Sequence, residues 1–276
     1  MSDTDTDAVP SAVLRAFGAG STAVRLEGGQ GRSVRVGDRV LKPVLDEDES
    51  AWIATLLGDL VVDGFRIGRP VPALDGGWVV EGWAAYEHEV GEAESDGRWD
   101  EVLATGGRFH AAVAHVPRPA MLDRRTHRWA VADRVAWGEA ALDAVPDVAV
   151  VHTRLERLRA PVDAVAQLIH GDLSGNVLFA DGLDPAVIDV SPYWRPTAYA
   201  DAVVVVDAVM WWGADPSLLE VGRELPDWPQ LLLRAVLFRL ASLNGKARED
   251  GPECLDQLAA FSPVVAAVEA AVRRTT

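Results

Sequence analysis

Four side chains able to perform acid–base and metal chemistry lie within one short stretch of the chain. His170 and Asp172 belong to an HGD sequence that follows an apolar run, Asn176 comes four residues after the aspartate, and Asp189 ends a second apolar run. The apolar runs around an Asp-Gly turn signal predict a β-hairpin that brings Asn176 and Asp189 close together, with Asp172 beside them. A carboxylate and an amide oxygen suit Mg²⁺, and a neighbouring aspartate can deprotonate a hydroxyl. The pattern predicts phosphoryl-transfer chemistry.

His-Gly-Asp, a nearby Asn and a hairpin ending in Asp together resemble the aminoglycoside phosphotransferase group of the protein-kinase-like superfamily. The resemblance implies that Asp172 is the catalytic base, that Asn176 and Asp189 hold Mg²⁺, and that His170 braces the loop. The kinase loop usually has four residues between its Asp and Asn, whereas this chain has three, so its loop must be tighter. Gly175 could supply the unusual backbone angle that a tight loop needs. The alternative is an ordinary hairpin with solvated acids in its turns.

Composition bounds the class of protein. A chain of 276 residues with 49% hydrophobic residues can form one large domain or two lobes that share a cleft. Its net charge of −16 argues against nucleic acid as a partner, because phosphate backbones require basic patches. The same charge either favours a cationic substrate or only serves solubility.

Targeting and redox signals predict a cytoplasmic protein with no membrane partner. The single cysteine, Cys254, excludes an intramolecular disulfide and a multi-cysteine zinc site, and it fits a reducing compartment. The first ten residues carry neither the basic nor the apolar region of a secretory signal. The most apolar stretch, Ala202 to Trp212, is too short to span a membrane and contains Asp207. Oligomeric state is not predicted by these features.

A glycine-rich segment lies between two expected strands, 22–26 and 33–36, after an expected disordered tail over 1–10 and a short helix capped by Ser11. Glycines there would let backbone N–H groups face phosphate oxygens, or they only form a hairpin turn. The order of glycine-rich loop, strand lysine and helix is that of a kinase N-lobe. It assigns nucleotide contacts to Gly28, Gly29, Gln30, Gly31 and Ser33.

Lys42 lies in the next expected strand and is one of only two lysines in the chain. Resemblance to the kinase VAIK strand implies that its ammonium reaches the α- and β-phosphates of ATP; the alternative is an edge-strand lysine that reaches water. An amphipathic helix is predicted over 46–60. Its Glu49 is placed either to pair with Lys42, as the kinase pattern requires, or to form a capping box with Asp46.

A strand over 77–83 is expected to lead into the hinge between the lobes. In kinase-like folds adenine pairs with hinge backbone groups, which points to Glu81 through Trp83. The cofactors implied by the resemblance are therefore ATP and Mg²⁺.

The remainder of the chain is expected to be mainly helical. His110, in a helix over 99–115, is interpreted as a core or surface residue, and the basic cluster over 123–134 as a solvated face or an anion site. Asp201 either ties its helix to the catalytic loop or caps it, and Asp207 needs a partner if it is buried. The segment Ser191 to Pro196 is too short for the activation segment of a protein kinase, which favours a small-molecule substrate.

These inferences predict an α+β, two-lobed protein-kinase-like fold, with a β-rich N-lobe over 11–82 and a mostly helical C-lobe over 83–276. The expected activity is transfer of the ATP γ-phosphoryl to a hydroxyl of a small molecule, such as an aminoglycoside, amino sugar, sugar or amino alcohol. The alternatives are a pseudokinase, meaning a nucleotide-binding regulatory module without transfer, and a plain interaction domain that retains only the fold.

Overall fold

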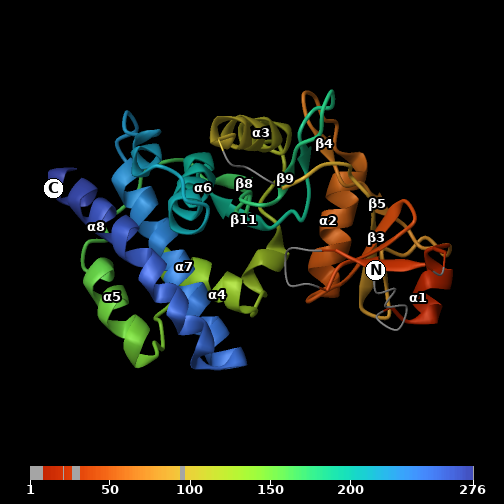
Figure 1. Ribbon diagram of the computed structural model, residues 1–276, viewed down its shortest axis with the longest axis horizontal. Coiled ribbons are helices and arrows are strands. Elements are labelled where there is room, and N and C mark those ends of the chain that lie inside the picture. The colour runs from red at the N-terminus through yellow and green to blue at the C-terminus, as the bar shows by residue number, and fades with distance from the viewer. Residues whose placement is uncertain (1–8, 21, 27–31, 94–96, 276) are drawn as a thin grey trace. The chain divides into compact units, whose positions relative to one another are not determined.

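The computed structural model describes residues 9–20, 22–26, 32–93 and 97–275. It divides the chain into two compact units (Figure 1). The first unit comprises Met1–Glu94 and Gly175–Val190, and the second comprises Ser95–Ser174 and Ser191–Thr276. The division after residue 94 replaces the expected one after residue 82. The hairpin predicted near the acidic residues belongs to the first unit, so that unit is not continuous in sequence.

An antiparallel sheet forms most of the first unit. Its strand order is β1-β2-β3-β7-β5, and β6 also pairs with β7. The strands are β1 (Ala23–Arg25), β2 (Val34–Val36), β3 (Arg39–Pro43), β5 (Pro70–Val71), β6 (Val79–Val80) and β7 (Trp83–Glu87). Val34 and Val36 are buried and Arg35 between them is exposed, as the period of two in a strand requires. Phe17 and Leu41 join these valines in one apolar cluster.

Two helices accompany this sheet. In α1 (Ser11–Ala16) the N-cap residue is Pro10 and no side chain caps the helix, so the expected cap at Ser11 is wrong. Val9 is buried, which shortens the expected tail; residues 1–8 lie outside the described part of the chain. The predicted second helix is confirmed as α2 (Glu47–Asp59), where the Asp46 carboxylate accepts the Glu49 N–H at 3.0 Å.

A second, smaller sheet of the first unit contains β4 (Arg66–Ile67), β10 (Ala186–Val187) and β9 (Val177–Leu178) in that order. Strands β9 and β10 are antiparallel, so the predicted hairpin is confirmed. Strand β4 runs parallel to β10 although it lies far away in sequence. Val177, Ala186 and Val187 are fully buried, which anchors the hairpin by its apolar residues.

The second unit is mostly helical around one apolar core. Helix α7 packs against α4, α5, α6 and α8 (Figure 1). The two strands of this unit, β8 and β11, pair antiparallel. Its helices and strands are α3 (Trp99–Ala112), α4 (Arg128–Ala136), α5 (Pro146–Glu156), β8 (Gln167–His170), β11 (Pro192–Arg195), α6 (Thr197–Trp211), α7 (Trp228–Asp250) and α8 (Leu258–Thr275), with 3-10 turns η2 (Ala120–Asp123), η3 (Pro216–Glu220) and η4 (Pro252–Gln257).

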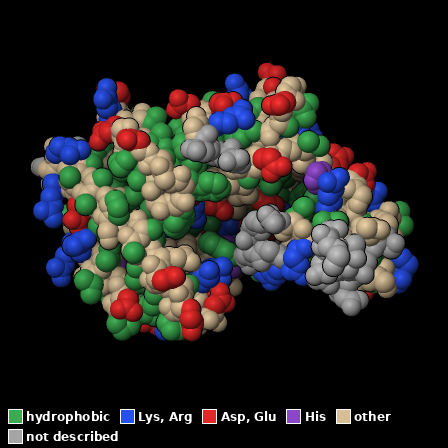
Figure 2. All heavy atoms as spheres, viewed as in Figure 1, with side chains coloured by type: hydrophobic (Ala, Val, Ile, Leu, Met, Phe, Trp, Pro, Cys, Tyr) green, Lys and Arg blue, Asp and Glu red, His purple; other side chains and the backbone are tan. Residues whose placement is uncertain are grey.

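Burial explains why α6 and α7 are apolar over most of their length. Val203 to Val206 in α6 and Leu231 to Ala241 in α7 are buried without interruption, which is typical of helices surrounded by other elements. Among the described residues, Pro252–Arg274 is long and apolar enough to cross a membrane, but length and composition alone are weak evidence. Phe261 and Val264 of this stretch pack into the core of the unit. On the face seen in Figure 2, acidic and basic side chains are interspersed.

Candidate active site

Lys42 and Asp189 form an ion pair inside the first unit. Lys42 follows the fully buried Leu41 in β3, and its Nζ lies 4.4 Å from the centre of the Tyr86 ring in β7. Burial alone would lower the pKa of Lys42, but the Asp189 carboxylate outweighs burial and the pKa is raised. The ammonium therefore stays charged at neutral pH. Tyr86 was not anticipated, because β7 was not expected to extend beyond residue 83.

The hairpin places Asn176 and Asp189 at the same end of its two strands. The Ile188 N–H donates to the Asn176 carbonyl at 3.0 Å, one residue beyond the paired strands. Asp189 has φ of +49°, a left-handed conformation that costs energy in a residue other than glycine. Its side chain is 42% exposed although it is paired with Lys42.

The donor set at this end of the hairpin fits a hard cation. One carboxylate and one amide oxygen, completed by phosphate oxygens and water, are typical ligands of Mg²⁺. Within the described part of the chain, no group of three or more His, Cys, Asp and Glu residues gathers around a possible metal position. An ion held here would therefore depend on the substrate for much of its coordination.

The glycine-rich segment is described only in part. Gly28, Gly29, Gln30 and Gly31 lie outside the described residues. Ser33 is half-buried at the start of β2, and its carbonyl accepts the Leu26 N–H at 3.0 Å. Glu49, in the first turn of α2, is half-buried. Its expected pairing with Lys42 stays a prediction, since the ion pair found for Lys42 is with Asp189.

The expected hinge position needs correction. Glu81 and Gly82, both with positive φ, form the two-residue turn between β6 and β7, and Trp83 pairs with Val80 and Pro43 inside the sheet. Such left-handed pairs are favoured in tight hairpins because they match strand twist. The single strand expected over 77–83 is in fact two strands, β6 and β7, joined by this turn.

The segment after β7 is the one that leaves the sheet, and Arg66 holds it. Its guanidinium donates to the Asp184 carbonyl at 2.8 Å and to the Val90 carbonyl at 2.9 Å, and it forms an ion pair with Glu89. Three segments far apart in the sequence are thus joined by one side chain. The segment continues to Glu92, which bridges to Phe179 after β9.

His170 braces the loop in which Asp172 lies, inside the second unit. Its Nδ1 accepts the N–H groups of Asp172 at 3.2 Å and of Ser191 at 3.4 Å, so the ring proton must be on Nε2. The backbone N–H of His170 donates to Nε2 of His110 at 3.2 Å. Burial, and then the neighbouring His170, lower the pKa of His110 to about 4, which keeps the ring neutral and able to accept. His110 is thus a core residue, as interpreted.

Asp172 contacts a charged pair of which the sequence analysis named Asp207 but not its partner, Arg239. Its Oδ1 accepts from Arg239 Nη2 at 2.7 Å, and Arg239 Nε also donates to Asp207 Oδ1 at 2.8 Å. Asp207 is fully buried in α6, so the expectation that it would need a partner is confirmed. Arg239 could have been noticed as the single charge among the apolar residues 235–241. Asp201, the other candidate in α6, is not its N-cap, which is Pro196; burial raises the pKa of Asp201 to about 6.

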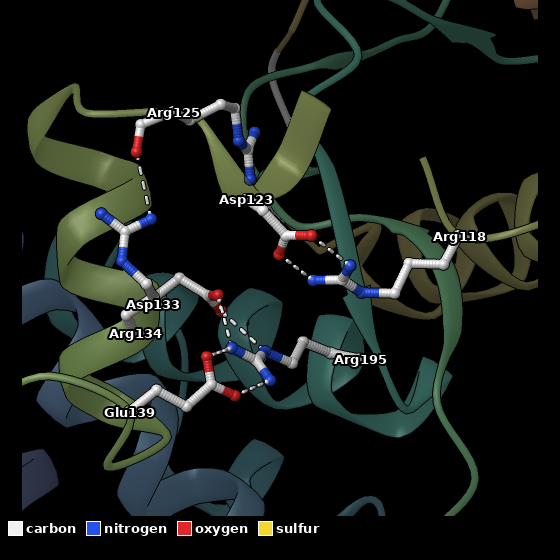
Figure 3. Close-up of polar contacts among 7 residues, drawn as sticks. All are labelled: Arg118, Asp123, Arg125, Asp133, Arg134, Glu139 and Arg195. Carbon is white, nitrogen blue, oxygen red and sulfur yellow. Dashed lines mark hydrogen bonds and ion pairs between the residues drawn. The ribbon is translucent and has the colours of Figure 1, made fainter. Parts of the chain in front are cut away.

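Another arginine anchors β11 beside this loop (Figure 3). Arg195 makes paired hydrogen bonds of 2.7–3.1 Å to Asp133 and of 2.7–2.9 Å to Glu139, both near the end of α4. In the basic cluster, Arg125 is buried over the Tyr193 ring. The cluster is therefore not wholly a solvated face.

Comparison with known proteins identifies the fold. No protein-family model and no curated protein sequence matches the chain. Solved structures do. A thermostable mutant of aminoglycoside phosphotransferase APH(4)-Ia, in a ternary complex with AMP-PNP and hygromycin B, has a TM-score of 0.60 at 17% identity, over 96% of this chain and 98% of that chain.

Two further structures are similar over nearly the whole chain. Spectinomycin phosphotransferase APH(9)-Ia, with ADP and spectinomycin, has a TM-score of 0.56 at 14% identity over 94% of this chain and 96% of its own. Amicoumacin kinase hAmiN, with AMP-PNP, Ca²⁺ and Ami, has a TM-score of 0.55 at 18% identity over 90% of this chain and 84% of its own. The expected kinase-like α+β fold, with a β-rich N-terminal part and a helical C-terminal part, is confirmed.

Proposed function

We propose that this protein is an ATP- and Mg²⁺-dependent phosphotransferase that moves the γ-phosphoryl group to a hydroxyl of a small molecule. The observation that carries the proposal is the ion pair of Lys42 with Asp189 at the end of the hairpin that also carries Asn176. A half-buried, charged lysine beside a carboxylate and an amide provides what a bound nucleoside triphosphate needs, a cation for its phosphates and ligands for its metal.

In this proposal each group has a separate task. Asn176 and Asp189 would hold Mg²⁺, which neutralises charge on the phosphates when bound. Lys42 would leave its ion pair with Asp189 and contact the phosphates instead. Asp172 would orient the acceptor hydroxyl and take its proton, while His170 keeps the Asp172 backbone in place. Because the transition state of phosphoryl transfer is loose, positioning and charge stabilisation would provide most of the rate.

The adenine contacts are proposed for the backbone between His88 and Ala93 instead of Glu81 and Trp83. This segment follows the last strand of the sheet and is held by Arg66 through Glu89 and Val90. The glycine-rich loop, through Gly28, Gly29, Gln30, Gly31 and Ser33, is proposed to cover the phosphates, and Glu49 to support Lys42.

The proposed acceptor is an aminoglycoside, amino sugar, sugar or amino alcohol. The printed ligands of the structural neighbours include spectinomycin and hygromycin B, and a net charge of −16 suits a cationic acceptor. Composition also predicts that the protein has no nucleic acid or membrane partner and that it is cytoplasmic, and both stay predictions.

The test measures ATP binding by calorimetry with and without Mg²⁺, followed by phosphoryl transfer to a panel of these acceptors. Asp189→Asn removes the proposed metal ligand, and Asp181→Asn, at the exposed turn of the same hairpin, is the matched control. We expect wild type and Asp181→Asn to bind ATP with Mg²⁺ and to transfer phosphate. We expect Asp189→Asn to lose both the Mg²⁺ effect and turnover, by at least about 100-fold.

Two outcomes would contradict the proposal. Equal ATP binding without metal, with no acceptor phosphorylated, would favour the pseudokinase alternative. Full turnover in Asp189→Asn would remove Asp189 from the metal site.

A further inference from the structure

We infer that Arg239 is a positioning residue for Asp172, and that Asp207 holds Arg239 in place. The inference deepens the proposed function and rests on it, since Asp172 is there the group that takes the hydroxyl proton. Arg239 lies in α7 and Asp207 in α6, so two core helices reach the catalytic loop through one guanidinium.

The burial of this arginine requires an explanation. Its side chain is 9% exposed, and that of Asp207 is 1% exposed. A buried ion pair contributes little net stability compared with apolar residues of similar size, because both charges lose their hydration. Arg239 also lies inside the uninterrupted buried run of α7, between Phe238 and Leu240. A second carboxylate partner, Asp172 in a half-exposed loop, indicates a role beyond packing.

The Arg239 guanidinium donates to two carboxylates, the buried one of Asp207 and the accessible one of Asp172. Asp207 takes the two-pronged contact, from Nε at 2.8 Å and from Nη2. Nη2 also donates to Asp172 Oδ1 at 2.7 Å, and the Asp172 side chain is 40% exposed. The bond to Arg239 restricts rotation of the Asp172 carboxylate.

The other buried arginine of the same helix does not share this arrangement. Arg234, one and a half turns earlier, is also buried, but it donates to the carbonyls of Gln230 at 3.1 Å and Ala160 at 2.7 Å. Its guanidinium therefore joins α7 to the chain at Ala160, and among the described residues it is not hydrogen-bonded to Asp172. Arg234 is therefore a matched control.

The first arm of the test observes the contact without using activity. In protein labelled with ¹⁵N-arginine, the Nη2–H resonance of Arg239, which marks the bond to Asp172, is expected to shift and its hydrogen exchange to accelerate on Asp172→Ala. The resonance of Arg234 is expected to stay unchanged. No change at Arg239 would overturn the inference, whether or not the protein proves to be a kinase.

The second arm measures turnover with Mg²⁺-ATP and whichever acceptor of the panel is phosphorylated. Because Arg239→Met alone would leave Asp207 buried without its partner, the double variant Arg239→Met/Asp207→Leu replaces the pair by apolar side chains of similar volume. We expect it to fold, with kcat lowered about 10- to 100-fold, less than the full effect of a general base, and with the KM for ATP unchanged.

The conservative variant separates positioning from packing. Arg239→Lys keeps the charge but cannot reproduce the fork, so kcat should fall between wild type and the double variant, whereas Arg234→Lys should retain wild-type kcat. A folded double variant with wild-type kcat would overturn the inference. If wild type transfers no phosphate, the proposed function fails, and the arginine resonances alone decide whether Arg239 positions Asp172.

Discussion

Acidification should destabilise the protein through His110, a buried histidine whose Nε2 accepts the backbone N–H of His170. The exposed fraction of this residue is 2%, and its pKa is lowered from 6.5 to about 4 by burial and by His170. The folded form binds a proton at His110 less readily than the unfolded chain does. The contribution of neutral His110 to the free energy of unfolding is therefore fully present above pH 6.5 and is lost as the pH falls toward 4. The full difference corresponds to about 3 kcal/mol, of which about 2 kcal/mol is lost between pH 7 and pH 5.

The assay is urea unfolding of wild type and His110→Gln at pH 7 and pH 5. Glutamine can still accept the His170 N–H but does not titrate. The pKa values of His88 and His152 are also lowered by burial, and their contribution cancels because both proteins contain them. We expect wild type to lose about 2 kcal/mol more than the variant. Equal losses in the two proteins would refute this assignment of His110.

Two further predictions concern the free energy of unfolding. Gly171→Ala would place Cβ 2.4 Å from a ring carbon of Tyr193, so it should lower the free energy of unfolding by about 1–3 kcal/mol. The control Gly107→Ala has open space around it in α3 and should raise the free energy of unfolding by up to about 1 kcal/mol. Equal melting temperatures of the two variants would contradict this prediction. Asp46→Ala removes the N-cap bond to the Glu49 N–H and should cost about 1 kcal/mol in chemical unfolding, with Asp46→Asn retaining most of it.

The hairpin and the order of elements could be predicted because local signals agreed with the fold. The apolar runs around Asp181-Gly182 define both strands, and α2 begins where its cap predicts. The two-residue turn at Glu81 was missed because glutamate rarely adopts positive φ. The parallel pairing of strand β4 with β10 has no local signal, since the partners are more than a hundred residues apart.

The candidate site shows the same limit. Asp172, Asn176 and Asp189 are found from spacing, because they are close in sequence. Arg239 contacts Asp172 across 67 residues, and periodicity alone assigns it only to an apolar helix. The need of Asp207 for a partner was predictable from burial cost; the identity of that partner depends on how α6 and α7 pack.

The discontinuity of the first unit has a consequence for how the chain folds as it is synthesised. Strand β4 leaves the ribosome with its partner β10 still about 120 residues from being made, which at typical elongation rates takes about 6 to 24 s. During that interval the edge of β4 has no native partner within the nascent chain, and Ile67 is among the residues waiting to be covered. Completion of the first unit is thereby delayed until residues 95–174 of the second unit have already been made.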